Sequence, residues 1–144
     1  TNHIQKRWQQ AKKMKRTLII LILTFSINCF AQTQAEMNKE AYRTYKKADK
    51  ELNSVYKNIL TEYKSDSIFV ENLKKSQRIW IEFRDAELKM KYPERRPGFY
   101  GTIHPICRAM YLEELTETRT KTLKQWLKGI ESLEACNGSI KINK

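Results

Sequence analysis

The first 92 residues of this 144-residue chain contain neither glycine nor proline, since all four glycines and all three prolines follow Tyr92. These two residue types break helices through backbone chemistry, glycine by its conformational freedom and proline by its missing N–H. A stretch of this length without either residue favours long helices. We therefore predict an all-α fold, with irregular backbone after residue 92.

Two apolar stripes with helical spacing occupy this part of the chain. The first recurs in steps of three and four residues from Ala41 to Tyr63. The second comprises Phe69, Leu73, Ser76, Trp80, Phe83 and Met90, widened by Ile79 and Ala86. Between them, Ser65-Asp66-Ser67 is a cluster of helix-capping type. Two long helices joined by so short a turn lie antiparallel, so we predict a long helical hairpin.

A loop and a third helix follow the hairpin. Residues 93–101 (PERRPGFYG) contain two prolines and two glycines, which predict irregular backbone. Thr102 can cap a third helix, Pro105 is tolerated in its first turn, and Gly129 can end it. The predicted architecture is the antiparallel hairpin plus a third antiparallel helix. Residues 137–144 are short and polar, and we predict a mobile tail.

Residues 1–31 read as an upstream extension and a secretory signal peptide. A basic start at Met14-Lys15-Arg16 precedes an apolar run, and the segment ends in Cys29-Phe30-Ala31, with small residues at the −3 and −1 positions. In the uncleaved chain this segment would be helical, and cleavage is expected after Ala31. Residues 17–31 would rise only about 22 Å as a helix, which argues against a membrane anchor. Acylation of Cys29 is the less favoured alternative, so we predict a periplasmic or secreted protein.

Residues 32–136 are predicted to form one domain. Residues 1–31 carry six basic and no acidic side chains, so the net charge of +12 for the whole chain falls to +6 for residues 32–144. A basic surface on an exported protein can contact anionic envelope polymers. Export argues against nucleic acid as a partner.

The sequence lacks the patterns of an enzyme. His104 precedes Cys107 by three residues, but no third orienting group or glycine-rich loop accompanies the pair. No metal-ligand spacing or phosphate-loop motif occurs. We therefore predict no catalytic residue, cofactor, metal or small-molecule substrate. We also predict no disulfide between Cys107 and Cys136. A helix from about Cys107 to Ile130 would span roughly 35 Å, whereas the six residues from Ile130 to Cys136 can extend back at most about 20 Å, so the two thiols could not meet.

Three motifs carry a family resemblance. They are Tyr45-x-x-Ala48-Asp49-x-x-Leu52-Asn53-x-x-Tyr56, Gln77-x-x-Trp80-x-x-Phe83-Arg84-Asp85-Ala86-Glu87 and Leu115-Thr116-x-x-Arg119-Thr120-x-x-Leu123. Their order and spacing resemble the LprI-type lysozyme-inhibitor domain, over roughly residues 34–127. The resemblance implies an exported helical protein that binds and blocks a peptidoglycan-cleaving lysozyme or another cell-wall hydrolase.

Most motif residues are predicted to be structural. The aromatic residues expected to pack in the core are Tyr45, Tyr56, Trp80 and Phe83. The polar residues expected to pair beside that core are Asp49, Asn53, Gln77, Arg84, Asp85 and Arg119. We expect Asp85 or Asp49 to accept a hydrogen bond from Arg119 and thereby tie the third helix to the hairpin.

The loop after the second helix supplies the candidate target-binding residues. Arginine and aromatic side chains are enriched at interface hot spots, and loops on rigid scaffolds often carry binding residues. The candidates are Arg95, Arg96, Phe99 and Tyr100. A projecting arginine can pair with a catalytic carboxylate of a glycoside hydrolase. The alternative is an envelope structural or adaptor module whose basic face binds anionic polymer or a partner protein, in which case high salt should abolish binding.

Overall fold

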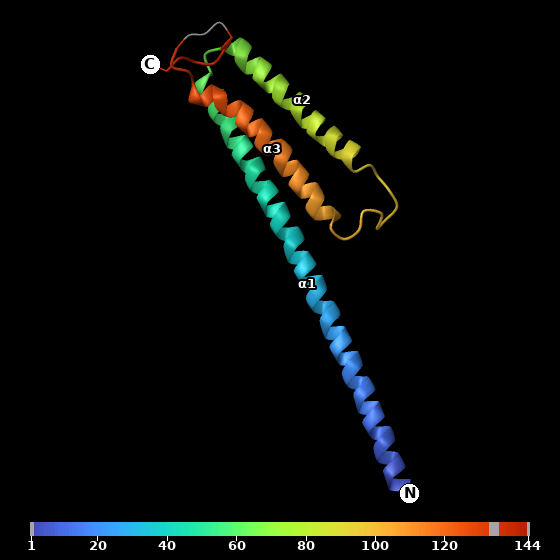
Figure 1. Ribbon diagram of the computed structural model, residues 1–144. Helices are drawn as coiled ribbons and strands as arrows, with labels where there is room; N and C mark the ends of the chain where they lie inside the picture. The colour runs from blue at the N-terminus through green and yellow to red at the C-terminus, as the bar shows by residue number, and fades with distance from the viewer. Residues whose placement is uncertain (1, 133–135, 144) are drawn as a thin grey trace. The chain divides into compact units, whose positions relative to one another are not determined.

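The computed structural model describes the backbone of residues 2–132 and 136–143 (Figure 1). Side chains are described for residues 7, 8, 12–15, 33–132 and 136–143. The described chain forms three α-helices: α1, Asn2–Glu62; α2, Ser67–Lys91; and α3, His104–Lys128. Within the described ranges the only pairing of β type is an isolated bridge between Ile130 and Ile142. The predicted all-α fold class is confirmed.

The chain divides into two compact units, Thr1–Met37 and Asn38–Lys144. The described part of the first unit is helical. The side chains of residues 16–32, where the predicted apolar run and Cys29 lie, are outside the described set, so the signal peptide stays a prediction. Among the described residues, no helix carries an apolar stretch sufficient to cross a bilayer.

The core of the second unit forms where its three helices meet. It comprises Leu52, Val55 and Ile59 of α1, Leu73 of α2 and Leu123 of α3. The α1 residues are spaced by three and four positions, so they share one face of the helix. The turn into α2 is capped by Asp66, whose carboxylate accepts a hydrogen bond of 2.9 Å from the Phe69 N–H. This cap lets two long helices reverse direction within a few residues.

The third helix packs antiparallel to α2, as predicted. Its residue Tyr111 donates a hydrogen bond to Glu87 near the end of α2, while Arg119 bonds Gln77 in the first half of α2. The start of α3 differs from the prediction, because its N-cap is Ile103 and no side chain caps the helix. Pro105 lies in the first turn, and Gly129 ends the helix with a φ of 68°.

The buried face of α2 differs from the apolar stripe read from the sequence. Phe83 is 50% exposed, and Ile79 and Met90 are 54% and 69% exposed. The buried positions are Leu73, Gln77 and Leu88. The expectation that Phe83 belongs to the core is therefore wrong. Large side chains occur on two faces of α2. The face with Leu73, Gln77 and Leu88 packs against the other helices, and the face with Ile79, Phe83 and Met90 is exposed.

The C-terminal segment has a defined place in the second unit. The Lys141 N–H donates to the Tyr63 hydroxyl at 3.0 Å, and the Asn143 N–H donates to the Ile130 carbonyl at 2.8 Å. An ion pair joins Lys141 to Glu62. These contacts connect Lys141 and Asn143 to the ends of α1 and α3, an arrangement that the polar composition of the tail did not predict.

Candidate functional site

The loop between α2 and α3 consists of consecutive turns. Phe99 N–H donates to the Arg96 carbonyl at 3.1 Å, and Gly101 N–H donates to the Gly98 carbonyl at 3.0 Å. Gly98 and Gly101 have φ angles of 80° and 71°. Glycine adopts this left-handed region without steric cost, so these two residues allow the chain to turn between the helices. Figure 1 shows the loop as an extended connection between the ends of α2 and α3.

Aromatic contacts support the loop from its own base. The Tyr100 hydroxyl donates to the Pro93 carbonyl at 2.8 Å and closes the loop upon itself. The Tyr100 and His104 rings stack with their centres 4.5 Å apart, and the Tyr92 and Tyr100 rings meet edge to face with their centres 5.7 Å apart. Tyr100 is therefore a half-buried positioning residue. Tyr92 and His104 could not be predicted as supports from the composition of the loop, because they lie outside the segment rich in glycine and proline.

The other three candidate residues are exposed. Arg95 and Arg96 lie on the solvent side of the loop, and Phe99 is 57% exposed. The Arg95 guanidinium lies 5.9 Å from the centre of the Phe99 ring. Neither arginine is ion-paired with a carboxylate of the described chain. The loop thus presents two unpaired cations beside an aromatic surface, a combination suited to binding carboxylates.

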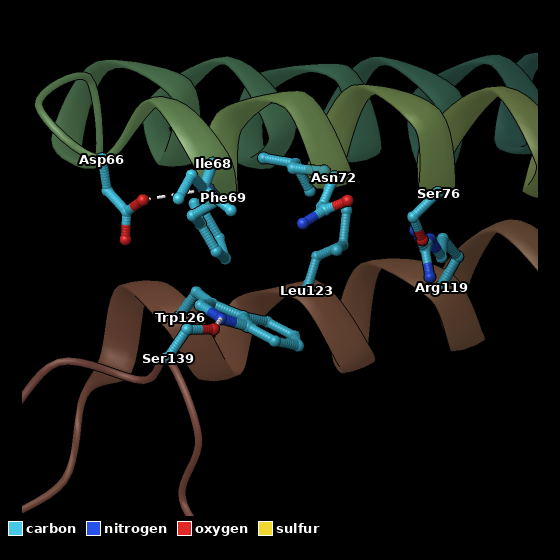
Figure 2. A pocket seen from close by; sticks show the side chains of 10 residues that line it. Asp66, Ile68, Phe69, Asn72, Ser76, Arg119, Leu123, Trp126 and Ser139 are labelled. Carbon is cyan, nitrogen blue, oxygen red and sulfur yellow. Dashed lines mark hydrogen bonds between the residues drawn. The ribbon is translucent and has the colours of Figure 1, made fainter.

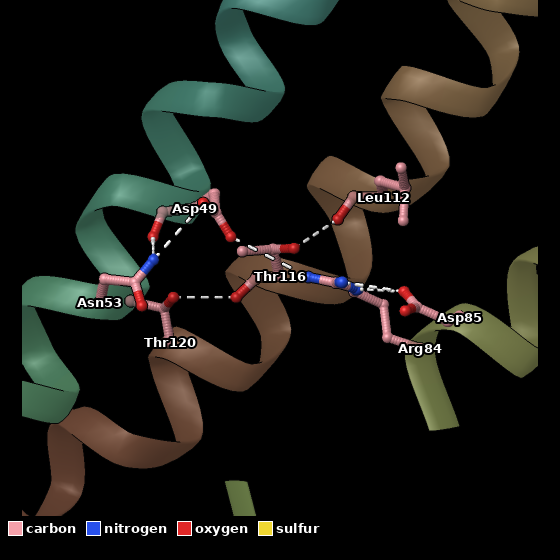
Figure 3. A network of polar contacts seen from close by, with 7 residues as sticks. All are labelled: Asp49, Asn53, Arg84, Asp85, Leu112, Thr116 and Thr120. Carbon is pink, nitrogen blue, oxygen red and sulfur yellow. Dashed lines mark hydrogen bonds and ion pairs between the residues drawn. The ribbon is translucent and has the colours of Figure 1, made fainter. Parts of the chain in front are cut away.

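The polar motif residues form a separate network between α1 and α2 (Figure 3). Arg84 donates to Asp85 through Nε and Nη2 at 2.9 and 2.8 Å, and its Nη1 lies 3.9 Å from Asp49 Oδ1. Asn53 donates to the Asp49 backbone carbonyl at 2.8 Å. The Arg84 guanidinium also lies 5.4 Å from the Trp80 ring centre. These residues connect the two arms of the hairpin.

The expected partner of Arg119 is corrected. Arg119 donates to Gln77 Oε1 at 3.1 Å and to Ser76 Oγ at 3.0 Å, and bonds neither Asp85 nor Asp49. Asp85 lies eight residues beyond Gln77, about 12 Å along α2, so the register of α3 places it out of reach. Burial lowers the pKa of the Arg119 guanidinium from its usual value. Arg119 does join α3 to α2, but through neutral partners.

The remaining motif residues contribute to packing. Tyr45 is 9% exposed, and Tyr56 and Trp80 are half-buried. Thr116 is fully buried and donates to the Leu112 carbonyl at 2.6 Å, which satisfies its hydroxyl within α3 (Figure 3). The structure therefore gathers the four loop candidates at one site and places the motif residues elsewhere.

Other reactive groups form no recognisable centre. Cys107 and Cys136 are free thiols. Across the residues open to description, no three His, Cys, Asp or Glu side chains come close enough to hold a metal ion. The site that remains is the exposed arginine and aromatic loop.

Comparison with known proteins identifies the family. The family model described as "Lysozyme inhibitor LprI" matches residues 29–123. A protein of Rhizobium meliloti (strain 1021), described as "Uncharacterized protein R02472", is 31% identical over 113 residues, which cover 71% of this chain and 79% of that protein. No solved structure matches the chain with significance. The protein belongs to the LprI lysozyme-inhibitor family.

Proposed function

We propose that the protein is an exported inhibitor that binds a peptidoglycan-cleaving hydrolase and blocks its cleft with the loop of residues 93–101. Membership of the LprI family supports a protein partner of the lysozyme class. The observation that carries the proposal is the exposure of Arg95, Arg96 and Phe99 on a loop that Tyr100 holds in shape.

The chemistry of the loop matches that of a glycosidase cleft. Most such enzymes act through a pair of carboxylates that flank the scissile bond. The planar guanidinium of Arg95 or Arg96 can form two charge-assisted hydrogen bonds with one carboxylate. Phe99 would bury apolar surface in a neighbouring sugar subsite. An inhibitor of this kind occupies the cleft and needs no catalytic group of its own.

The supported shape of the loop contributes to affinity. A flexible segment loses conformational freedom when it binds, and this loss opposes association. The Tyr100–Pro93 hydrogen bond and the Tyr100–His104 stack restrict the loop before it meets its target. The loop therefore loses less conformational entropy on binding, and a larger share of the contact energy contributes to affinity.

The predicted leader is consistent with this role. A signal peptide cleaved after Ala31 would deliver residues 32–144, with the domain at 32–136, to the compartment in which wall hydrolases act. The product would be periplasmic or secreted. Acylation of Cys29 would instead anchor the same domain at a membrane surface.

A wall-lysis assay tests the proposal. Turbidity of a bacterial wall suspension is followed with lysozymes of several classes, with and without the protein. The Arg95→Ala/Arg96→Ala variant should lose most inhibition, because it removes both loop cations. The Lys74→Ala/Lys75→Ala variant, which removes two adjacent exposed charges from α2, is the matched control. Equal inhibition by the parent and the loop variant would end the assignment of the loop.

A further inference from the structure

A groove lies between the first half of α2 and the second half of α3, at the end of α2 opposite the loop (Figure 2). Its volume is about 510 Å³, within the range of small-molecule sites. Five of the ten residues that line it are apolar, namely Ile68, Phe69, Leu73, Leu123 and Trp126. The Phe69 and Trp126 rings lie 6.2 Å apart between centres. The groove therefore offers an apolar space with two aromatic walls.

One end of this groove holds a cation without a charged partner. Arg119 lines the groove, and its two hydrogen bonds go to the neutral groups of Gln77 and Ser76. No carboxylate of the described chain is paired with it. Arg84 on the neighbouring helix, by contrast, has Asp85 at 2.8 Å. A half-buried guanidinium normally has an anion beside it, because removing its charge from water is costly.

The opposite end of the groove would orient an anion. Asp66 lies there, ten residues before Ser76, which corresponds to about 15 Å along α2. Its carboxylate repels a negative head group, whereas Arg119 attracts one. The indole N–H of Trp126 is occupied by Ser139 at 3.0 Å, so the Trp126 ring offers mainly its apolar surface. An anionic head therefore belongs at Arg119, with an apolar body along Phe69 and Trp126.

We propose that this groove binds a small amphiphile with one carboxylate head and an apolar tail, of the free fatty-acid type. The carboxylate pairs with Arg119 by charge-assisted hydrogen bonds, and Asn72 and Ser76 supply neutral polar groups beside it. The tail displaces water from the apolar walls. The amphiphile is a ligand and not a substrate, since no bond changes. This site is independent of the proposed inhibitory loop.

Calorimetric titration with three matched probes tests the chemistry of the groove. Decanoate carries the required head and tail, decanol carries the tail without charge, and decylamine carries the opposite charge. All are used below their micelle-forming concentrations. Decanoate should bind at one site, and at least about tenfold more tightly than decanol. Equal binding of decanoate and decanol, or tighter binding of decylamine, overturns the proposal.

Two variants locate the site. Arg119→Gln should weaken decanoate binding at least about tenfold, while Arg78→Gln, which removes the same charge from the exposed surface of α2, should not. Arg119 also joins two helices, so its variant could unfold. Asn72→Trp then decides, because Asn72 is exposed and lines the groove, so a large side chain there occupies the groove while both hydrogen-bond partners of Arg119 remain in place. Unchanged decanoate binding by a folded Asn72→Trp protein, checked by circular dichroism, refutes the site.

Two further measurements separate a groove ligand from surface adhesion. The indole resonance of Trp126 should shift with decanoate, and an unchanged Trp126 resonance contradicts the proposal. Sedimentation with phosphatidylglycerol vesicles distinguishes a free acid from a lipid head group. If Asn72→Trp abolishes vesicle binding, the groove binds phospholipid and the free-acid assignment is overturned. If the variant binds vesicles as well as the parent does, the vesicles bind elsewhere and the free-acid assignment stands.

Discussion

Arg119 of α3 donates a 3.1 Å hydrogen bond through its Nε to Oε1 of Gln77 on α2, and Gln77 is only 8% exposed. The bond joins the last helix to the hairpin with a charged donor and a neutral acceptor. A buried amide that serves one partner is a sensitive point of the fold, because its loss leaves a half-buried cation with less compensation.

Replacing this amide should therefore destabilise the protein. We expect Gln77→Leu to lower the free energy of unfolding by about 1–3 kcal/mol, since the substitution keeps the volume and removes the acceptor of Arg119. Urea denaturation followed by circular dichroism measures the change. Gln125→Leu, at an exposed position of α3, is the control and should stay within about 0.5 kcal/mol of the parent. Equal losses for the two variants would show that the Arg119 bond contributes nothing to stability.

The Tyr100 hydroxyl should matter for the loop more than for the fold. Tyr100→Phe removes the hydrogen bond to the Pro93 carbonyl and keeps the stack on His104. We expect the free energy of unfolding to fall by about 0.5–1.5 kcal/mol. We also expect weaker inhibition in the wall-lysis assay, because the loop becomes less ordered. Hydrogen exchange at the Gly101 amide should become faster. Tyr42→Phe, at a 55% exposed position of α1, serves as the control and should change none of these three measurements.

Two glycines with similar backbone angles should respond differently to alanine. Gly129 has a φ of 68° and Gly138 a φ of 56°, so an added side chain is strained at either position. At Gly129 the new Cβ would also clash with the side chain of Asn143, whereas nothing lies within 4 Å of that position at Gly138. Gly138→Ala should cost about 1 kcal/mol, and Gly129→Ala should cost clearly more. Thermal unfolding compares them, and equal shifts in Tm would exclude a role for the tail contact.

Salt should change the rate of association with a target in a direction set by the target's charge. Residues 32–144 carry a net charge of +6, because six of the +12 charges of the whole chain lie in residues 1–31. A basic lysozyme is repelled at long range, so added salt should speed its association, while an acidic hydrolase should associate more slowly. Stopped-flow kinetics at several ionic strengths measures both. Association with a basic lysozyme that slows steadily with salt would indicate adhesion through charge rather than a fitted contact.

The phenol of Tyr111 should titrate above its ordinary range. Its hydrogen bond of 3.0 Å to Glu87 Oε2, with desolvation and the Glu87 charge as lesser causes, raises its pKa. A raised pKa in the folded state means that the bond stabilises the fold below the ordinary tyrosine pKa, and that this contribution is lost as the pH rises through the folded value. Glu87→Gln should move the Tyr111 pKa down, as resolved by NMR of labelled tyrosine. An unchanged titration would show that Glu87 does not hold the phenol.

Local features of the chain predicted much of the architecture. Helix ends follow from Asp66, Pro105 and Gly129, whose effects depend on a few neighbouring residues. The loop follows in the same way from its glycines and prolines. The candidate residues of that loop are brought together because they lie within one short segment.

Partner choice could not be predicted in this way. Arg84 pairs with Asp85 and approaches Asp49, whereas Arg119 lies at the level of Gln77 and Ser76, more than two helical turns before Asp85. The buried face of α2 passes through Gln77 and Leu88, and the apolar face with Phe83 and Met90 remains exposed. Both faces are compatible with helical periodicity. The periodicity predicts that apolar side chains share a face of the helix, but it does not determine which face packs against the other helices.

The amino-acid sequence by itself determined the helical class, the family and the position of the arginine and aromatic loop, because each depends on neighbours along the chain. The tertiary structure decided the rotation of α2, the partners of Arg119 and the groove between α2 and α3. These features depend on how one helix is turned and shifted against another. That relation is set by the packing of residues far apart in the chain, such as Leu73 and Leu123.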